Sequence, residues 1–120
     1  MARILIADDA VFMRMTIKKM LEPQGHEIVA EAGDGEETIK LCTETQPDLI
    51  ILDITMPGMD GIEALEKIKK MDRNVKIIIC SALGQQEIVA QAIVLGAENF
   101  IVKPFEAGQL IAAVEKVMRS

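Results

Sequence analysis

Aromatic rings, thiols and imidazoles are scarce in this sequence. Its 120 residues include no Trp, no Tyr, three Phe, two Cys and one His. A zinc or haem site lacks ligands, because Cys42 and Cys80 form no CxxC pair and His26 stands alone. We therefore expect both thiols to be reduced and unreactive. The shortage of rings also disfavours a flavin electron carrier, which stacks its cofactor on aromatic side chains.

Long apolar runs and an excess of positive charge are missing as well. No run approaches the roughly 20 apolar residues that cross a bilayer, and Asp8 and Asp9 interrupt the N-terminus before a signal-peptide core forms. Thirteen Lys and Arg stand against 19 Asp and Glu, a formal net charge of −6. A net negative charge disfavours binding to the phosphate backbone of a nucleic acid. We expect a cytoplasmic protein that binds neither membrane nor nucleic acid.

The length and the hydrophobic pattern indicate one domain over residues 1–120, with a monomer as the expected state. Short apolar runs alternate with segments of helical periodicity, and no linker or low-complexity tract separates them. Most of these runs are continuously apolar, which is typical of parallel strands covered by helices on both faces. The expected fold is a three-layered, doubly wound α/β sheet. The expected strands are 4–7, 27–32, 49–52, 76–80 and 99–102.

Five helices are expected to follow the five strands, and local signals mark some of their ends. Asp34 and Glu37 have the spacing of a capping box. Pro104 is expected to begin the last helix. Gly25 and Gly96 lie just past helical segments, where a left-handed residue is needed.

Polar side chains follow four of the five expected strands. Asp8 and Asp9 come after the first, Asp53 after the third, Ser81 after the fourth and Lys103 after the fifth. Carboxyl ends of parallel strands meet at one edge of a sheet, where such folds bind ligands. Taken singly, each residue is compatible with capping or an ordinary salt bridge. Capping does not explain a doubled acid or a lysine before proline.

Charge balance at this edge indicates a metal. At about 5 Å and an effective dielectric near 20, each pair of carboxylates costs roughly 3 kcal/mol. Lys103 supplies one positive charge, and a divalent cation would supply the two that remain. Because the candidate ligands are all oxygens, we expect Mg²⁺ rather than zinc or copper.

Mg²⁺ beside a carboxylate, an amine and a hydroxyl suits phosphoryl transfer. Asp53 is the candidate nucleophile because it stands alone at the central strand end, which leaves Asp8 and Asp9 to hold the metal. The product would be an aspartyl phosphate whose charge Lys103 and Ser81 bind.

Four segments, 4–9, 53–61, 80–82 and 101–105, together resemble the receiver domain of bacterial two-component response regulators. The resemblance runs the whole length and is strongest to stand-alone chemotaxis members. It implies a flavodoxin-like five-stranded parallel sheet of order 2-1-3-4-5 with five helices in three layers. That order places the first and third strands side by side.

The resemblance also implies roles for individual residues. Asp53 accepts the phosphoryl group from a histidine kinase. Asp9 and Asp53 bind Mg²⁺ together with the backbone carbonyl of Thr55, and Asp8 helps through water. Thr55 and Leu83 occupy positions that tune how fast the phosphoryl group is lost, and the apolar Leu83 is expected to slow that loss.

The resemblance also implies a conformational switch that responds to phosphorylation. Lys103 contacts the phosphoryl group across a cis bond to Pro104. Ser81 is the switch hydroxyl, and Phe100 stands where the family carries its switch aromatic, commonly Tyr. Because Phe has no hydroxyl to satisfy at the surface, we expect Phe100 to favour the inward rotamer.

The implied function is that of a single-domain regulator which signals by contact. Phosphorylation would switch its binding to the flagellar motor switch, with a phosphatase as a further partner. It would be a phospho-acceptor with intrinsic self-phosphorylation and autodephosphorylation rather than an enzyme. A phosphorelay intermediate remains an alternative. A Mg²⁺-dependent phosphatase is a weaker one, because that class carries a second acid where Thr55 stands.

Overall fold

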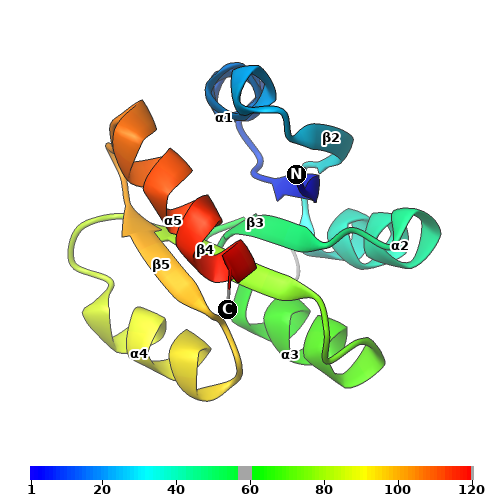
Figure 1. The fold of residues 1–120 in the computed structure, drawn as a ribbon. Helices are drawn as coiled ribbons and strands as arrows, with labels where there is room; N and C mark the ends of the chain where they lie inside the picture. The colour runs from blue at the N-terminus through cyan, green and yellow to red at the C-terminus, as the bar shows by residue number, and fades with distance from the viewer. Residues whose placement is uncertain (57–60, 120) are drawn as a thin grey trace.

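The computed structural model describes residues 1–56 and 61–119, and its centre is a parallel sheet (Figure 1). The strand order is β2-β1-β3-β4-β5, and every pair of neighbours is parallel. The predicted fold class and strand order are confirmed. The strands are β1 (Arg3–Ala7), β2 (Glu27–Ala32), β3 (Leu49–Asp53), β4 (Lys76–Ser81) and β5 (Asn99–Val102).

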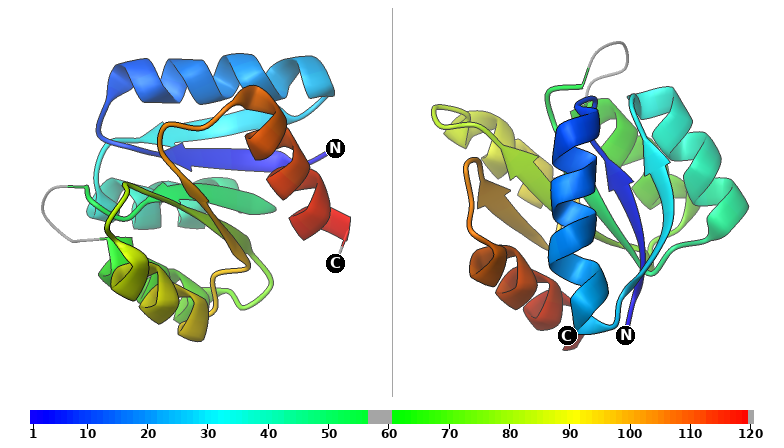
Figure 2. Two further views of the ribbon diagram at one scale, coloured as in Figure 1. Left: turned by 90° about the vertical axis from the view of Figure 1, so that its left-hand side faces the viewer. Right: turned by 90° about the horizontal axis from the view of Figure 1, so that it is seen from above.

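Helices cover both faces of the sheet and make three layers (Figure 2). The α-helices within the described residues are α1 (Val11–Leu21), α2 (Gly35–Thr45), α3 (Gly61–Met71), α4 (Gln86–Val94) and α5 (Ala107–Arg119), and a short 3₁₀ helix, η1 (Glu22–Gln24), follows α1. One face carries α1 and α5, and the other carries α2, α3 and α4. Within the described residues, no helix combines the length and apolar content needed to cross a bilayer.

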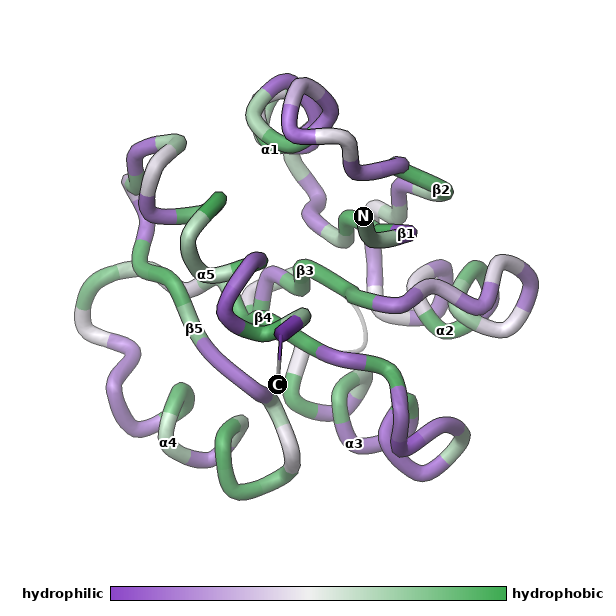
Figure 3. Tube along the Cα trace, in the orientation of Figure 1, coloured by the Kyte–Doolittle hydropathy of each residue, from purple (hydrophilic) through white to green (hydrophobic). Residues whose placement is uncertain are grey.

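The core lies in two clusters, one on each face of the sheet. Successive side chains of a strand point to opposite faces, so Ile50 packs toward α3 while Ile51 packs toward α1 and α5. All five residues of β3 are buried. Figure 3 shows this central strand as hydrophobic, whereas the helices alternate in hydropathy. Burial on both faces explains why the central runs are continuously apolar.

Several predicted helix ends are confirmed. The Asp34 carboxylate accepts a hydrogen bond from Glu37 N at 2.7 Å and caps α2. The Glu37 carboxylate in turn accepts a hydrogen bond from Gly33 N rather than from Asp34 N, a variant of the capping box. Gly25 and Gly96 have φ angles of +92° and +117°, in the left-handed region that favours glycine.

The prediction that Pro104 begins the last helix is wrong, because α5 begins at Ala107. The side chain of Gln109 accepts a hydrogen bond from Glu106 N at 2.7 Å, and the Glu106 carbonyl accepts from Gln109 N at 3.0 Å. These bonds make Glu106 the capping residue just before α5 and leave Pro104 in the preceding loop. The Lys103–Pro104 peptide bond is cis, as the resemblance implied.

Candidate phosphoryl-acceptor site

The carboxyl ends of the strands gather four of the sequence-predicted residues at one edge of the sheet. Asp8 and Lys103 directly follow β1 and β5, whereas Asp53 and Ser81 are the last residues of β3 and β4. Because β1 pairs with β3, Asp8 lies beside Asp53. Residues 57–60, in the segment after Asp53, lie outside the described residues.

The three acids form a compact oxygen cluster. One carboxylate oxygen each from Asp8, Asp9 and Asp53 lies within 4.8 Å of the other two. Asp8 and Asp53 are buried, with 1% and 3% of their surface exposed, while Asp9 is exposed. A hard divalent cation such as Mg²⁺ prefers this donor set, and it usually keeps several waters on an open side. The residues therefore fit a magnesium ion.

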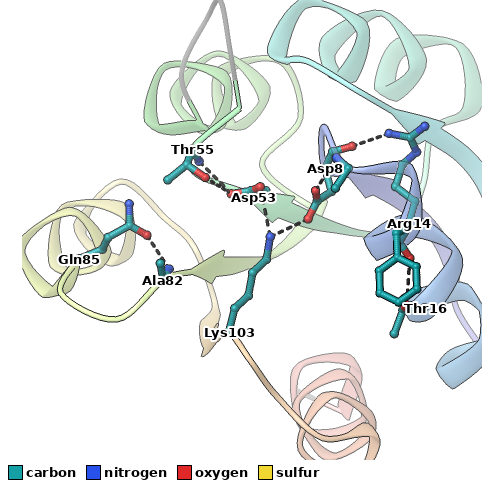
Figure 4. A network of polar contacts seen from close by, with 10 residues as sticks. Asp8, Arg14, Thr16, Asp53, Thr55, Ala82, Gln85 and Lys103 are labelled. Atoms are coloured by element: carbon teal, nitrogen blue, oxygen red, sulfur yellow. Dashed lines mark hydrogen bonds and ion pairs between the residues drawn. The ribbon is translucent and has the colours of Figure 1, made fainter.

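Lys103 compensates part of the negative charge (Figure 4). Its Nζ donates to Asp8 Oδ2 at 2.8 Å and to Asp53 Oδ2 at 3.2 Å. Burial alone would lower the pKa of Lys103, but the hydrogen bond to Asp8 and the charges of both acids outweigh it, so this pKa is raised. The lysine is thus a cation at neutral pH, and three carboxylates with one lysine leave a formal charge of −2 for a divalent ion.

The second oxygen of Asp53 is held by Thr55. Asp53 Oδ1 accepts hydrogen bonds from Thr55 N at 2.9 Å and from Thr55 Oγ1 at 2.7 Å. The sequence analysis gave Thr55 a carbonyl ligand and an influence on phosphoryl loss, but it missed these two hydrogen bonds to Asp53. The signal was present, because an Asp side chain commonly bonds the backbone two residues on. Asp53 is therefore oriented from both sides, by a cation and by a turn.

Gly61 brings the start of α3 against the backbone that carries Asp53. A Cβ on Gly61 would lie 2.3 Å from Ile54 Cα and 2.9 Å from Asp53 O. No side chain fits in that space, so this close approach requires glycine.

Arg14, in the second turn of α1, also reaches the site and was missed by sequence reasoning. Its Nη1 donates to the backbone carbonyl of Asp8 at 2.6 Å, and the Asp8 carboxylate accepts from Ala10 N at 2.9 Å. The sequence pattern does not single out Arg14, because Lys18 and Lys19 follow on the same helix.

Ser81 lies next to Lys103, whose backbone N–H donates to Ser81 O at 2.7 Å. The Ser81 hydroxyl is buried, and it has no hydrogen-bond partner within residues 1–56 and 61–119. A buried hydroxyl in this condition costs about 1–3 kcal/mol. Such a group gains most from a new partner at the site.

The expectation that Phe100 turns inward is wrong, since 45% of its surface is exposed. It lines a largely apolar cavity of about 420 Å³ with Leu83, Val89 and Ile93. The expectation considered only the missing hydroxyl. It did not allow for β5 being an edge strand, where α4 leaves the side chain partly uncovered.

Comparison with known proteins agrees with this geometry. The family model described as the response regulator receiver domain matches residues 4–115. The chain belongs to this family. As a receiver domain it belongs to two-component signalling. Receiver domains typically bind Mg²⁺, and the acidic cluster of this chain could hold such an ion.

Several similar curated relatives are chemotaxis proteins. The receiver domain is 53% identical to the chemotaxis protein CheY of Bacillus subtilis over 116 residues, 97% of each chain. It is 48% identical to CheY of Thermotoga maritima, with 98% of each chain covered. A chain in the crystal structure of the CheX–CheY–BeF₃–Mg²⁺ complex from Borrelia burgdorferi superimposes with a TM-score of 0.93 at 36% identity, covering 97% of this chain and 88% of that one.

Proposed function

We propose that this receiver domain accepts a phosphoryl group on Asp53 from a histidine kinase and acts as a cytoplasmic, monomeric chemotaxis regulator. One observation carries the proposal. The buried Asp53 carboxylate is held by Lys103 and Thr55 and lies in a cluster with Asp8 and Asp9. These contacts fix the direction of the Asp53 carboxylate, and Lys103 lies close enough to bind the negative charge of an incoming phosphoryl group.

Asp9, Asp53 and the backbone carbonyl of Thr55 would hold Mg²⁺, and Asp8 would assist through water. When bound, the ion supplies positive charge that offsets the charge on the phosphoryl oxygens. Lys103 stays paired with the acids until the phosphoryl group arrives and then binds one of its oxygens.

The transfer exchanges one bond for another. An oxygen of Asp53 attacks the phosphorus of a phosphohistidine, a P–O bond forms and the P–N bond breaks. The imidazole leaves with the electron pair and takes up a proton. Hydrolysis of the aspartyl phosphate later returns Asp53 and releases inorganic phosphate, so the domain is a phospho-acceptor with intrinsic activity on itself.

The output would arise from a repacking of Ser81 and Phe100. The Ser81 hydroxyl, which has no partner in the described part of the chain, would donate to a phosphoryl oxygen, and the Phe100 ring would then move into the adjoining cavity. This change would alter the face formed by α4, β5 and α5, which a flagellar motor switch protein would read. The names of the curated relatives support a chemotaxis role.

Acetyl phosphate and Mg²⁺ test the acceptor. Wild type and Asp53→Asn are titrated with Mg²⁺ at fixed acetyl phosphate, and phosphorylation is followed by intact mass. We expect wild type to gain one phosphoryl group only when Mg²⁺ is present, and the variant to gain none. One phosphoryl group on Asp53→Asn would refute the assignment of Asp53.

A second experiment separates motor control from a phosphorelay, in which the phosphoryl group passes to another protein. An N-terminal peptide of a motor switch protein is used to capture the domain with and without beryllofluoride. Motor control requires stronger capture with beryllofluoride. Equal capture in both states would favour the relay. The Mg²⁺-dependent phosphatase stays the weaker alternative, because Thr55 offers no acid to a leaving group.

A further inference from the structure

Arg14 connects α1 to the ends of two strands. Its Nη1 donates to the Asp8 carbonyl at 2.6 Å, and its Nε donates to Glu31 Oε1, on β2, at 3.2 Å. The Arg14 side chain is only 16% exposed. Figure 4 shows it reaching from α1 to the backbone of Asp8, on the side away from Lys103. The planar guanidinium makes both contacts from one rigid group.

We propose that Arg14 is a positioning residue that holds the Asp8–Asp9 segment in the orientation that binds Mg²⁺. The proposal rests on the Mg²⁺ use proposed above. The Asp8 carbonyl and the Asp9 N–H belong to one planar peptide unit, so a bond that fixes the carbonyl also fixes the plane from which Asp9 departs. Asp9 is exposed, in contrast to Asp8, so little protein surrounds its side chain.

A positioning role and a simple charge effect predict opposite signs. Arg14 is a cation near three acids, so losing its charge alone would strengthen the binding of Mg²⁺. Loss of an orienting contact would weaken it, by about tenfold for groups that orient metal ligands. Glu31 already offsets much of the Arg14 charge, because the two groups lie 3.2 Å apart. We therefore expect the orienting effect to dominate.

Lys69 offers a matched control at the opposite edge of the sheet. Its Nζ donates to the Val75 carbonyl at 2.7 Å and to Glu98 Oε2 at 2.9 Å, and its side chain is 13% exposed. Lys69 thus repeats the chemistry of Arg14, a cation bound to a backbone carbonyl and to a carboxylate. Val75 and Glu98 precede β4 and β5, so this cluster lies away from the acids.

The experiment is a calorimetric Mg²⁺ titration of wild type, Arg14→Met and Lys69→Met, each well below its measured Tm. We expect the dissociation constant of Arg14→Met to rise about tenfold, and that of Lys69→Met to stay within about twofold of wild type. Arg14→Lys, which keeps the charge but lacks the rigid fork, should lie between wild type and Arg14→Met. It also provides the test if Arg14→Met does not fold.

Each remaining outcome overturns the proposal. Unchanged or tighter Mg²⁺ binding in Arg14→Met would show no positioning effect. An equal loss of Mg²⁺ affinity in Lys69→Met would assign the effect to general destabilisation. A wild-type dissociation constant in Arg14→Lys would show that the planar guanidinium is not needed. If wild type itself takes up no Mg²⁺, the proposed use of the metal fails first, and the role of Arg14 fails with it.

Discussion

Lys103 Nζ lies 2.8 Å from Asp8 Oδ2 and 3.2 Å from Asp53 Oδ2, so one cation ties together the acids that end two neighbouring strands. The shorter bond goes to Asp8, not to the proposed phospho-acceptor. Both carboxylates are buried, and an unpaired buried charge is strongly destabilising. Lys103 therefore stabilises the fold at this edge as well as serving the proposed chemistry.

Replacing Lys103 by Met should cost more stability without Mg²⁺ than with it. In EDTA the buried Asp8 and Asp53 lose their cation, and we expect a loss of about 1–3 kcal/mol, below the full cost of breaking a buried pair because Lys103 is partly exposed. In Mg²⁺ the ion replaces part of the missing charge, so the loss should shrink. Urea denaturation in EDTA and in Mg²⁺ measures both values.

The exposed Lys19→Met serves as the control for Lys103→Met, and it should change stability by less than about 0.5 kcal/mol in either condition. An equal loss for Lys103→Met with and without Mg²⁺ would contradict the idea that the lysine and the ion compensate the same charges.

Gly61→Ala should destabilise the domain by about 1–3 kcal/mol, because the new methyl group overlaps the backbone of Ile54 and Asp53. Gly108→Ala is the matched control. Gly108 is the second residue of α5, and beyond its own helix turn and chain neighbours no described atom lies within 4 Å of a new Cβ, so alanine there should stabilise the domain by up to about 0.5 kcal/mol. Thermal or urea unfolding of both variants checks the opposite signs. A neutral Gly61→Ala would show that the α3 start adjusts freely.

The fold was predictable because apolar runs and polar strand ends are local signals. Ile50 and Ile51 are both apolar because each faces a different layer of helices. A strand buried on both faces is therefore recognisable in the sequence as a continuous apolar run. Asp53 stood out for the opposite reason, as a lone acid at the end of such a run. The adjacency of Asp8 and Asp53 needed the strand order, which came from the resemblance to the family.

Orientation was harder to predict than position. Phe100 was placed on the correct strand, but the orientation of its side chain depends on how far α4 covers the edge strand β5. The local sequence pattern does not show how far that coverage extends. The role of Arg14 was invisible because its two acceptors, the Asp8 carbonyl and Glu31, come from other elements. Contacts of this kind depend on tertiary packing rather than on residue spacing.

Cys80 should resist alkylation in the folded protein. Burial raises the pKa of its thiol to about 12, and the nearby Lys103 cation only partly opposes this effect. Burial also raises the pKa of Cys42, next to Asp72. Because the thiolate is the reactive form, iodoacetamide at pH 8 should add nothing to the native protein within the time that alkylates both thiols in urea. Intact mass measures the additions, and Cys42→Ser assigns them. Rapid native modification of that variant would place Cys80 nearer solvent.

The lifetime of the phosphoryl group should depend on Leu83 and Thr55. Leu83 is 79% exposed, so Leu83→Glu should fold normally while offering a carboxylate that admits the attacking water. Thr55→Asn replaces a hydroxyl that bonds Asp53 with a longer polar group. We expect both variants to lose phosphate faster than wild type in a radiolabel chase. Val94 is similarly exposed at the end of α4, so Val94→Glu controls for added charge and should decay at the wild-type rate. Equal decay in all four proteins would mean that these two side chains do not limit access of water to Asp53.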